Sequence, residues 1–169
     1  MSETIERTVL SEGQPAPDFT LPVVGGDETS GDQLHLADLR GRTVVLYFYP
    51  KDNTPGCTTE ACNFRDMHPE FRRRGIAVLG ISADEVDSHR DFAEKYHLPF
   101  PLLADVGASV ARQYGAYGEK TLYGRKYLGV QRMTFLIDRD GVIRKIWRSV
   151  KPDGHAQEVL RAIEELQLA

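Results

Sequence analysis

Only two of the 169 residues are cysteines, and they lie close together as Cys57 and Cys62. Two thiols cannot build the disulfide framework of a small secreted protein. They also cannot form a four-ligand zinc site unless histidines or carboxylates join them. The five histidines are scattered, and their spacing places no group of them on one metal-binding face. Cysteines this scarce and this close together therefore indicate redox chemistry.

Long apolar runs are also lacking, since none approaches the roughly 20 residues that cross a bilayer. The first ten residues show no basic start followed by an apolar stretch, so we expect no secretory signal. The net charge is -4, which makes nucleic acid or an anionic membrane an unfavourable partner. No glycine-rich phosphate-binding motif appears, so no nucleotide cofactor is indicated. We expect a cytoplasmic protein.

The remaining composition is that of an ordinary globular chain, with 41% hydrophobic and 27% charged residues. A chain of this length can bury about 70% of its unfolded surface, which is enough for one full core. We therefore expect a single domain over residues 1–169.

The hydrophobic pattern alternates between strands and helices along most of the chain. Residues 1–42 are rich in glycine and proline, and they predict an extended or hairpin extension at the N-terminus. The expected strands then span 43–49, 76–82, 101–104, 133–137 and 142–147, and the expected helices span 57–74, 86–96, 109–114 and 155–166. Asp140-Gly141 between the last two strands is a hairpin signal. This order predicts an α/β fold of thioredoxin-like topology, with a central mixed β-sheet flanked by helices.

The predicted helix 57–74 has one apolar face, made by Cys57, Ala61, Phe64, His68 and Phe71 at spacings of three and four. Pro69 is expected to kink or shorten this helix. Gly75 is expected to end it.

Cys57 lies at the predicted start of that helix, with Thr54 as the N-cap and Pro55 in the first turn. Free backbone N–H groups and the positive helix end stabilise a thiolate there. A thiol with a pKa of about 8.5 is about 3% ionised at pH 7, whereas a pKa of about 6 makes it about 90% thiolate. The alternative interpretation is a buried, inert cysteine. For Cys62 the alternative is a small apolar filler.

The spacing of five residues separates the two thiols in a regular helix. Their Cα atoms would lie about 8.7 Å apart, whereas a disulfide needs less than about 7 Å. An intact helix therefore predicts two free thiols, and a bond between them requires the first turns to unwind. The spacing also differs from the C-x-x-C of disulfide oxidoreductases.

The stretch YFYPKDNTPGCTTEAC, residues 47–62, closely resembles the active site of peroxiredoxins. The family pattern Pro-x-x-x-Thr-x-x-Cys falls on Pro50, Thr54 and Cys57. A second cysteine at +5 is typical of two-cysteine members of the bacterioferritin comigratory protein or peroxiredoxin Q subfamily. Further agreements at residues 80–82, 117–120 and 132–138 extend the resemblance over nearly the whole chain.

The resemblance implies a thiol-dependent peroxidase that reduces hydrogen peroxide and organic hydroperoxides without a cofactor or metal. Cys57 then attacks the peroxide and becomes a sulfenic acid, and Cys62 condenses with it to a disulfide. Thioredoxin is the implied reductant, with glutaredoxin also possible, and we expect a monomer or a weak homodimer.

The resemblance also assigns supporting roles. Thr54 hydrogen-bonds the thiolate and the peroxide, and Arg132 supplies positive charge. Pro50 shields the site from water. Glu60 orients the arginine, although it is equally explained as a favourable acid in the first helical turn.

Two rival functions remain open from the sequence. One is a thiol-disulfide oxidoreductase acting on protein disulfides, against which the spacing argues. The other is a non-enzymatic thioredoxin-like binding module in which the cysteines only pack.

Overall fold

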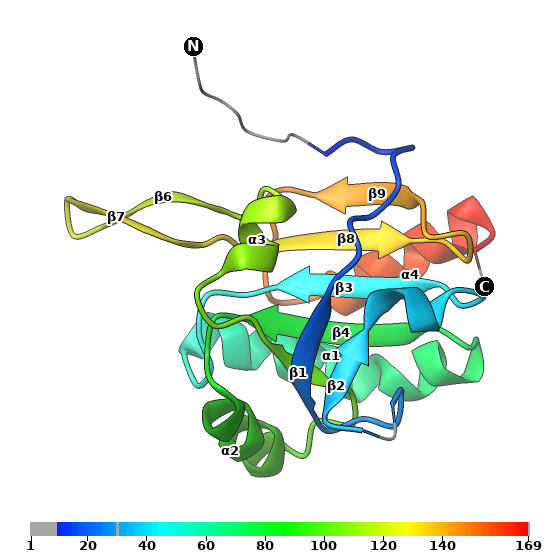
Figure 1. Ribbon diagram of the computed structural model, residues 1–169, viewed down its shortest axis with the longest axis horizontal. Helices are drawn as coiled ribbons and strands as arrows, with labels where there is room; N and C mark the ends of the chain where they lie inside the picture. The colour runs from blue at the N-terminus through cyan, green and yellow to red at the C-terminus, as the bar shows by residue number, and fades with distance from the viewer. Residues whose placement is uncertain (1–9, 30, 169) are drawn as a thin grey trace.

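The computed structural model describes residues 10–29 and 31–168 (Figure 1). The strands are β1 (Thr20–Val24), β2 (Gln33–His35), β3 (Val44–Phe48), β4 (Ala77–Ser82), β5 (Leu102–Ala104), β6 (Tyr117–Leu122), β7 (Arg125–Val130), β8 (Met133–Ile137) and β9 (Ile143–Trp147). The helices are the 3₁₀-helix η1 (Leu36–Leu39) and the α-helices α1 (Pro55–Arg73), α2 (Val86–Tyr96), α3 (Ser109–Gln113) and α4 (His155–Leu166). The first part of the expected N-terminal extension, residues 1–9, lies outside the described residues.

Seven strands of the described chain form one sheet in the order β2-β1-β5-β4-β3-β8-β9. The three central strands β3, β4 and β5 run parallel, while β1, β8 and β9 pair antiparallel with their neighbours. The predicted mixed sheet is thereby confirmed. The predicted hairpin is also confirmed, because β8 and β9 pair across the turn at Gly141, which has a φ of 81°.

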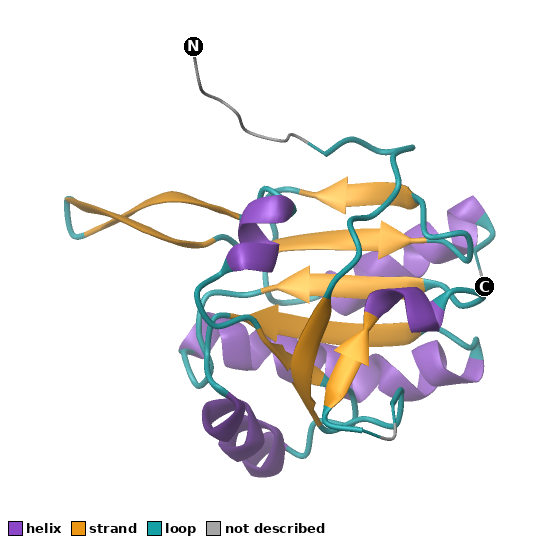
Figure 2. Cartoon of the chain, viewed as in Figure 1, coloured by secondary structure: helices purple, strands orange, loops and turns teal. Residues whose placement is uncertain are grey.

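Helices cover the sheet on both faces (Figure 2). Alternate residues of β3 point to opposite faces, as the pleat requires. Val45 and Tyr47 belong to one core, which they share with α1, α2 and α4. Leu46 and Phe48 belong to the other core, which they share with η1 and α3. The continuous apolar run of residues 43–49 is thus explained by burial on both sides. None of the helices in residues 10–29 and 31–168 is long and apolar enough to cross a membrane.

The helix α1 differs from its predicted form at Pro69. We expected the proline to kink or shorten the helix, and the shortening is wrong, since the α-helix continues through Pro69 to Arg73. Pro69 itself is exposed, whereas Phe71 beyond it is fully buried. Burial of Phe71 stabilises the last turn by about 2 kcal/mol, which offsets much of the proline's cost. The predicted stop at Gly75 is confirmed by its φ of 74°.

The strands β6 and β7 form a separate two-stranded hairpin that was not predicted. It projects from the body of the molecule (Figure 1), and Tyr123 at its tip is 95% exposed. The left-handed pair Tyr123-Gly124 makes the turn, with φ values of 53° and 77°. Because this ribbon buries little, its sequence carries no clear apolar alternation.

Candidate active site

The topology brings Cys57 and Arg132 to the same edge of the sheet. Phe48 ends β3, and the chain then enters α1, which carries Cys57 in its first turn. The strand β8 runs antiparallel to β3 and begins at Met133, directly opposite Phe48. Arg132 immediately precedes that strand. The carboxyl edge of the parallel strands, where α/β proteins place their ligands, therefore holds both residues.

Cys57 is 1% exposed and lies in the first turn of α1. The predicted N-cap position of Thr54 is confirmed by its extended backbone and by the hydrogen bond from Thr58 N–H to its carbonyl. Its hydroxyl does not cap the helix, because it donates instead to the carbonyl of Lys51 at 2.8 Å. The first-turn N–H groups of α1 thus lack a side-chain cap from Thr54.

The guanidinium of Arg132 connects the thiol to a buried carboxylate. Nη2 donates to Sγ of Cys57 at 3.4 Å, and Nη1 donates to Oε1 of Glu60 at 2.6 Å. Glu60 is one helical turn beyond Cys57, and its side chain is fully buried. The contact with the arginine that was expected of Glu60 is present. The alternative, a favourable acid in the first helical turn, does not describe this position, because the first turn of α1 holds no acidic residue.

Burial sets the electrostatics of this cluster. It raises the pKa of Glu60 to about 7, although the attraction of Arg132 opposes the rise. Burial acts to lower the pKa of Arg132, but the charges of Glu60 and Cys57 outweigh it, so that pKa lies above its usual value. The arginine therefore keeps its positive charge beside the sulfur. Burial, with Glu60 and Cys57 nearby, also raises the pKa of Tyr47.

Cys62 lies one and a half turns further along α1 and is partly exposed. Both thiols are free, and α1 is continuous across them. The expectation that an intact helix keeps them apart is thereby confirmed. Pro50 is half-buried and directly follows the buried Tyr49, the first residue after β3.

Two further residues stand close to this cluster without having been assigned a role from the sequence. A Cβ atom on Gly56 would lie 3.0 Å from Nη2 of Arg132, so the glycine permits the close approach of the arginine. Lys120 of β6 donates to the carbonyl of Val130. Burial, reinforced by Arg132, lowers the pKa of Lys120, and Cys57 opposes that shift.

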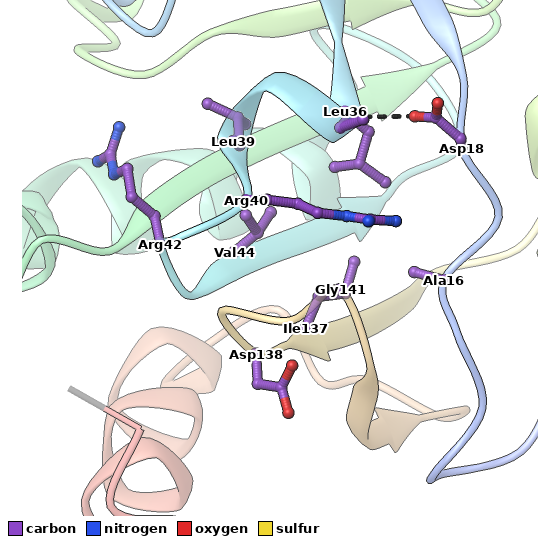
Figure 3. A pocket seen from close by; sticks show the side chains of 11 residues that line it. Ala16, Asp18, Leu36, Leu39, Arg40, Arg42, Val44, Ile137, Asp138 and Gly141 are labelled. Atoms are coloured by element: carbon purple, nitrogen blue, oxygen red, sulfur yellow. Dashed lines mark hydrogen bonds between the residues drawn. The ribbon is translucent and has the colours of Figure 1, made fainter.

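A separate small hollow lies at the opposite edge of the sheet, between η1 and the β8–β9 turn (Figure 3). Val44 at the start of β3 and Asp138 after β8 help to line it. The side chain of Arg40 extends across it between Leu36 and Gly141 (Figure 3). Its position, at the far end of β3 from Cys57, separates it from the cysteine chemistry.

Comparison with known proteins agrees with this geometry. Residues 12–146 match the model of the AhpC/TSA family. A relative from Coxiella burnetii, named as a bcp peroxiredoxin, is 53% identical over 151 residues, which cover 89% of this chain and 97% of that protein. Peroxiredoxin Bcp of Bacillus subtilis is 44% identical over 154 residues, covering 91% of this chain and 95% of the relative.

Solved structures of bacterioferritin comigratory proteins also resemble this chain in fold. The bacterioferritin comigratory protein of Xanthomonas campestris, described for its alkyl peroxide reduction activity, superposes with a TM-score of 0.78 at 39% identity. The match covers 87% of this chain and 90% of that one.

Proposed function

The chain belongs to the AhpC/TSA family, and its relatives from Coxiella burnetii and Bacillus subtilis are named as peroxiredoxins. We propose how its cysteine site carries out peroxide reduction. The protein is a peroxidase of the peroxiredoxin type on a thioredoxin-like α/β fold. Its substrates are hydrogen peroxide and organic hydroperoxides, including the alkyl peroxides reduced by the Xanthomonas relative. We assign the attacking thiolate to Cys57.

In the first step the thiolate of Cys57 attacks one oxygen of the peroxide, and the O–O bond breaks. The sulfur becomes a sulfenic acid, and the other oxygen takes up a proton and leaves as water or an alcohol. Arg132, at 3.4 Å from the sulfur, stabilises the thiolate and the negative charge that develops on the leaving oxygen. Thr54 contributes its hydroxyl oxygen as an acceptor for the peroxide, and Pro50 limits the access of water.

In the second step the thiol of Cys62 attacks the sulfenic sulfur. A disulfide forms and water leaves, which returns the first oxygen of the substrate to solvent. The continuous helix must open for this step, because its geometry holds the two Cα atoms about 8.7 Å apart.

The disulfide is then reduced by a dithiol partner. We propose thioredoxin in the cytoplasm, where thioredoxin and glutathione keep thiols reduced, with glutaredoxin as the alternative. We also propose that residues 1–169 form one domain, a monomer or weak homodimer, and that sulfur alone carries the reaction.

The contact between Arg132 and Cys57 is the observation that carries this assignment. It is tested by counting free thiols before and after one equivalent of hydrogen peroxide. The wild type is expected to lose both thiols, and Cys57→Ser is expected to keep its single thiol and to lack peroxidase turnover. A binding module would keep both thiols. Substantial turnover by Cys57→Ser would show that the attacking residue lies elsewhere.

A further inference from the structure

A buried polar network joins the loop before α1 to the neighbouring helix α2. Asp52, in the loop, and His89, in α2, are 37 residues apart in sequence, and Oδ2 of Asp52 lies 2.8 Å from Nδ1 of His89. The side chains are 2% and 0% exposed, respectively. Asp52 lies inside the stretch that resembles the family's active site but at an unassigned position of its pattern, His89 lies outside that stretch, and the mechanism as stated gives neither a role.

Each polar atom of the Asp52 carboxylate has a partner within the chain. Oδ1 accepts from the hydroxyl of Tyr49 at 2.6 Å, and Oδ2 also accepts from the hydroxyl of Ser88 at 2.8 Å. The backbone N–H of Asp52 donates to Asp84, 2.8 Å away. Bonds on the side chain and the backbone together therefore fix Asp52 in position.

Both ring nitrogens of His89 have hydrogen-bond partners inside the protein. Nε2 lies 2.8 Å from the carbonyl oxygen of Leu103, which can only accept, so Nε2 carries a hydrogen. Nδ1 faces Oδ2 of Asp52 at 2.8 Å, so both ring nitrogens are hydrogen-bonded, as buried polar groups require.

This arrangement is better explained as an anchor than as a metal site. Ligand atoms of Asp52, Asp84 and His89 lie within 4.8 Å of one another. However, the carboxylate oxygens already accept hydrogen bonds from the hydroxyls of Ser88 and Ser82 and from the N–H of Asp52, and Nδ1 of His89 is bonded to Asp52.

Asp52 lies two residues before Thr54, the residue at the start of α1 that is proposed to contact the peroxide. Asn53 follows Asp52 in the left-handed conformation, with a φ of 63°, and turns the chain into Thr54 at the start of α1. Thr54 in turn hydrogen-bonds to Lys51, the residue before Asp52. The position of the Thr54 hydroxyl therefore depends on where Asp52 is held.

We propose that Asp52 and His89 are positioning residues for peroxide attack, which fix the loop of residues 50–54 on α2 so that Thr54 meets the peroxide beside Cys57. This inference rests on the proposed function. It assigns the pair to the oxidation step alone, because none of the network's hydrogen bonds reaches Cys57 or Arg132, the charged group that stabilises the thiolate.

The test compares two reactions of Cys57. Its rate of oxidation by hydrogen peroxide is followed by stopped-flow fluorescence of Trp147, the single tryptophan, which lies in the same core cluster. Its rate of alkylation by iodoacetamide depends on the thiolate but needs no peroxide-binding loop. Asp52→Ala is expected to slow oxidation about tenfold or more, on the scale that small misplacements cost, and to change alkylation less than about threefold.

Asp52→Asn is the conservative variant. Its amide oxygen can accept from Tyr49, and its NH₂ can donate to Nδ1 of a neutral His89, so oxidation is expected to return to near the wild-type rate. The matched control is Asp105→Asn, since Asp105 is equally buried but accepts from the N–H groups of Val110 and Ala111 in α3. This control is expected to oxidise at the wild-type rate.

Tyr49→Phe provides a second route if Asp52→Ala does not fold, because it removes one hydrogen bond to Asp52 and keeps the apolar ring. It is expected to slow oxidation about threefold with unchanged alkylation. Wild-type oxidation in folded Asp52→Ala, an equal fall of both reactions, or failure of Asp52→Asn to restore the rate would each overturn the proposal. A wild-type protein that does not react with peroxide would instead refute the proposed function.

Discussion

Nη2 of Arg132 lies 3.4 Å from Sγ of Cys57, a residue 75 positions earlier in the chain. Arg132 is partly buried, and its other terminal nitrogen is bound to Glu60. The guanidinium is therefore fixed by the protein before any peroxide arrives. A charge that is already in place requires no reorganisation when negative charge develops on the leaving oxygen.

Arg132→Met is expected to lower the thiolate fraction of Cys57 at neutral pH and to slow peroxide reduction by about 10²-fold, the scale seen when one charge-stabilising donor is lost. The thiolate is measured by its ultraviolet absorbance as a function of pH, and the rate by single-turnover oxidation. Arg90→Met is the control, because Arg90 makes an exposed ion pair with Asp87 on α2. If thiolate and rate both stay at wild-type values, Arg132 does not act at the sulfur.

Glu60→Gln is expected to remove a pH dependence of stability. Burial raises the pKa of Glu60 from 4.5 to about 7, so the folded protein holds this proton where the unfolded chain has lost it. The contribution of Glu60 to stability therefore falls as pH rises from 4.5 to about 7, and the loss is complete above that window. At 1.36 kcal/mol per pH unit the fall is on the order of 3 kcal/mol.

The measurement is the difference in the free energy of unfolding between Glu60→Gln and the wild type, taken by urea titration across this window. The glutamine keeps an oxygen that accepts from Arg132, so the variant isolates the proton. The difference is expected to rise in favour of the variant as pH increases. A difference that does not change with pH would mean that Glu60 is ionised throughout.

Gly56→Ala is expected to slow peroxide oxidation without lowering the stability of the fold. Alanine favours the helix by up to about 1 kcal/mol, but its Cβ would lie 3.0 Å from Nη2 of Arg132 and 3.6 Å from Pro152. The guanidinium must then move by a few tenths of an ångström, which disturbs its contact with Cys57. We expect equal or higher stability in urea with slower peroxide oxidation. Thr59→Ala, at an exposed position on the same turns of α1, is the control that gains helix propensity only, and a matching loss of rate there would reject this explanation.

Burial explains which elements could be predicted from the sequence. The strands around residues 46, 79 and 135 form the middle of the sheet, and the helices 86–96 and 155–166 pack on it. Their apolar patterns are therefore strong, and their predicted positions are confirmed. The β6–β7 ribbon projects into solvent, and it shows no such pattern. Pro69 was misjudged because the packing of Phe71 on the sheet, which no local rule contains, keeps the helix continuous.

In the candidate site, too, some residues are placed by local sequence rules and others only by the tertiary fold. Thr54 and Cys57 are neighbours on one helix start, so their relation follows from local rules of capping. The place of Arg132 depends on the antiparallel pairing of β8 with β3, and only the family resemblance pointed to it. The contact between Asp52 and His89 joins the loop before α1 to α2, and the two residues are 37 positions apart in the sequence. No local sequence pattern predicts such a contact.

Cys62→Ser is expected to leave the first oxidation of Cys57 at the wild-type rate and to stop the cycle at the sulfenic acid. Without a resolving thiol, excess peroxide is expected to drive Cys57 to the sulfinic acid. Mass spectrometry of the intact protein distinguishes these products, since a sulfinic acid carries two added oxygen atoms and a disulfide none. Continued turnover with thioredoxin in this variant would assign the resolving role to a group other than Cys62.

Disulfide formation is expected to unwind the start of α1, residues 55–64. In the intact helix the Cα atoms of Cys57 and Cys62 are about 8.7 Å apart, beyond the reach of a disulfide. Gly56 weakens this first segment, whereas Asp52 is held on α2 by the pair with His89, so the opening is expected to begin after Asn53. Hydrogen exchange of reduced and oxidised protein should show lost protection in residues 55–64 and unchanged protection in α2. Equal protection in both states, together with a proven Cys57–Cys62 disulfide, would contradict local unwinding as the route to that bond.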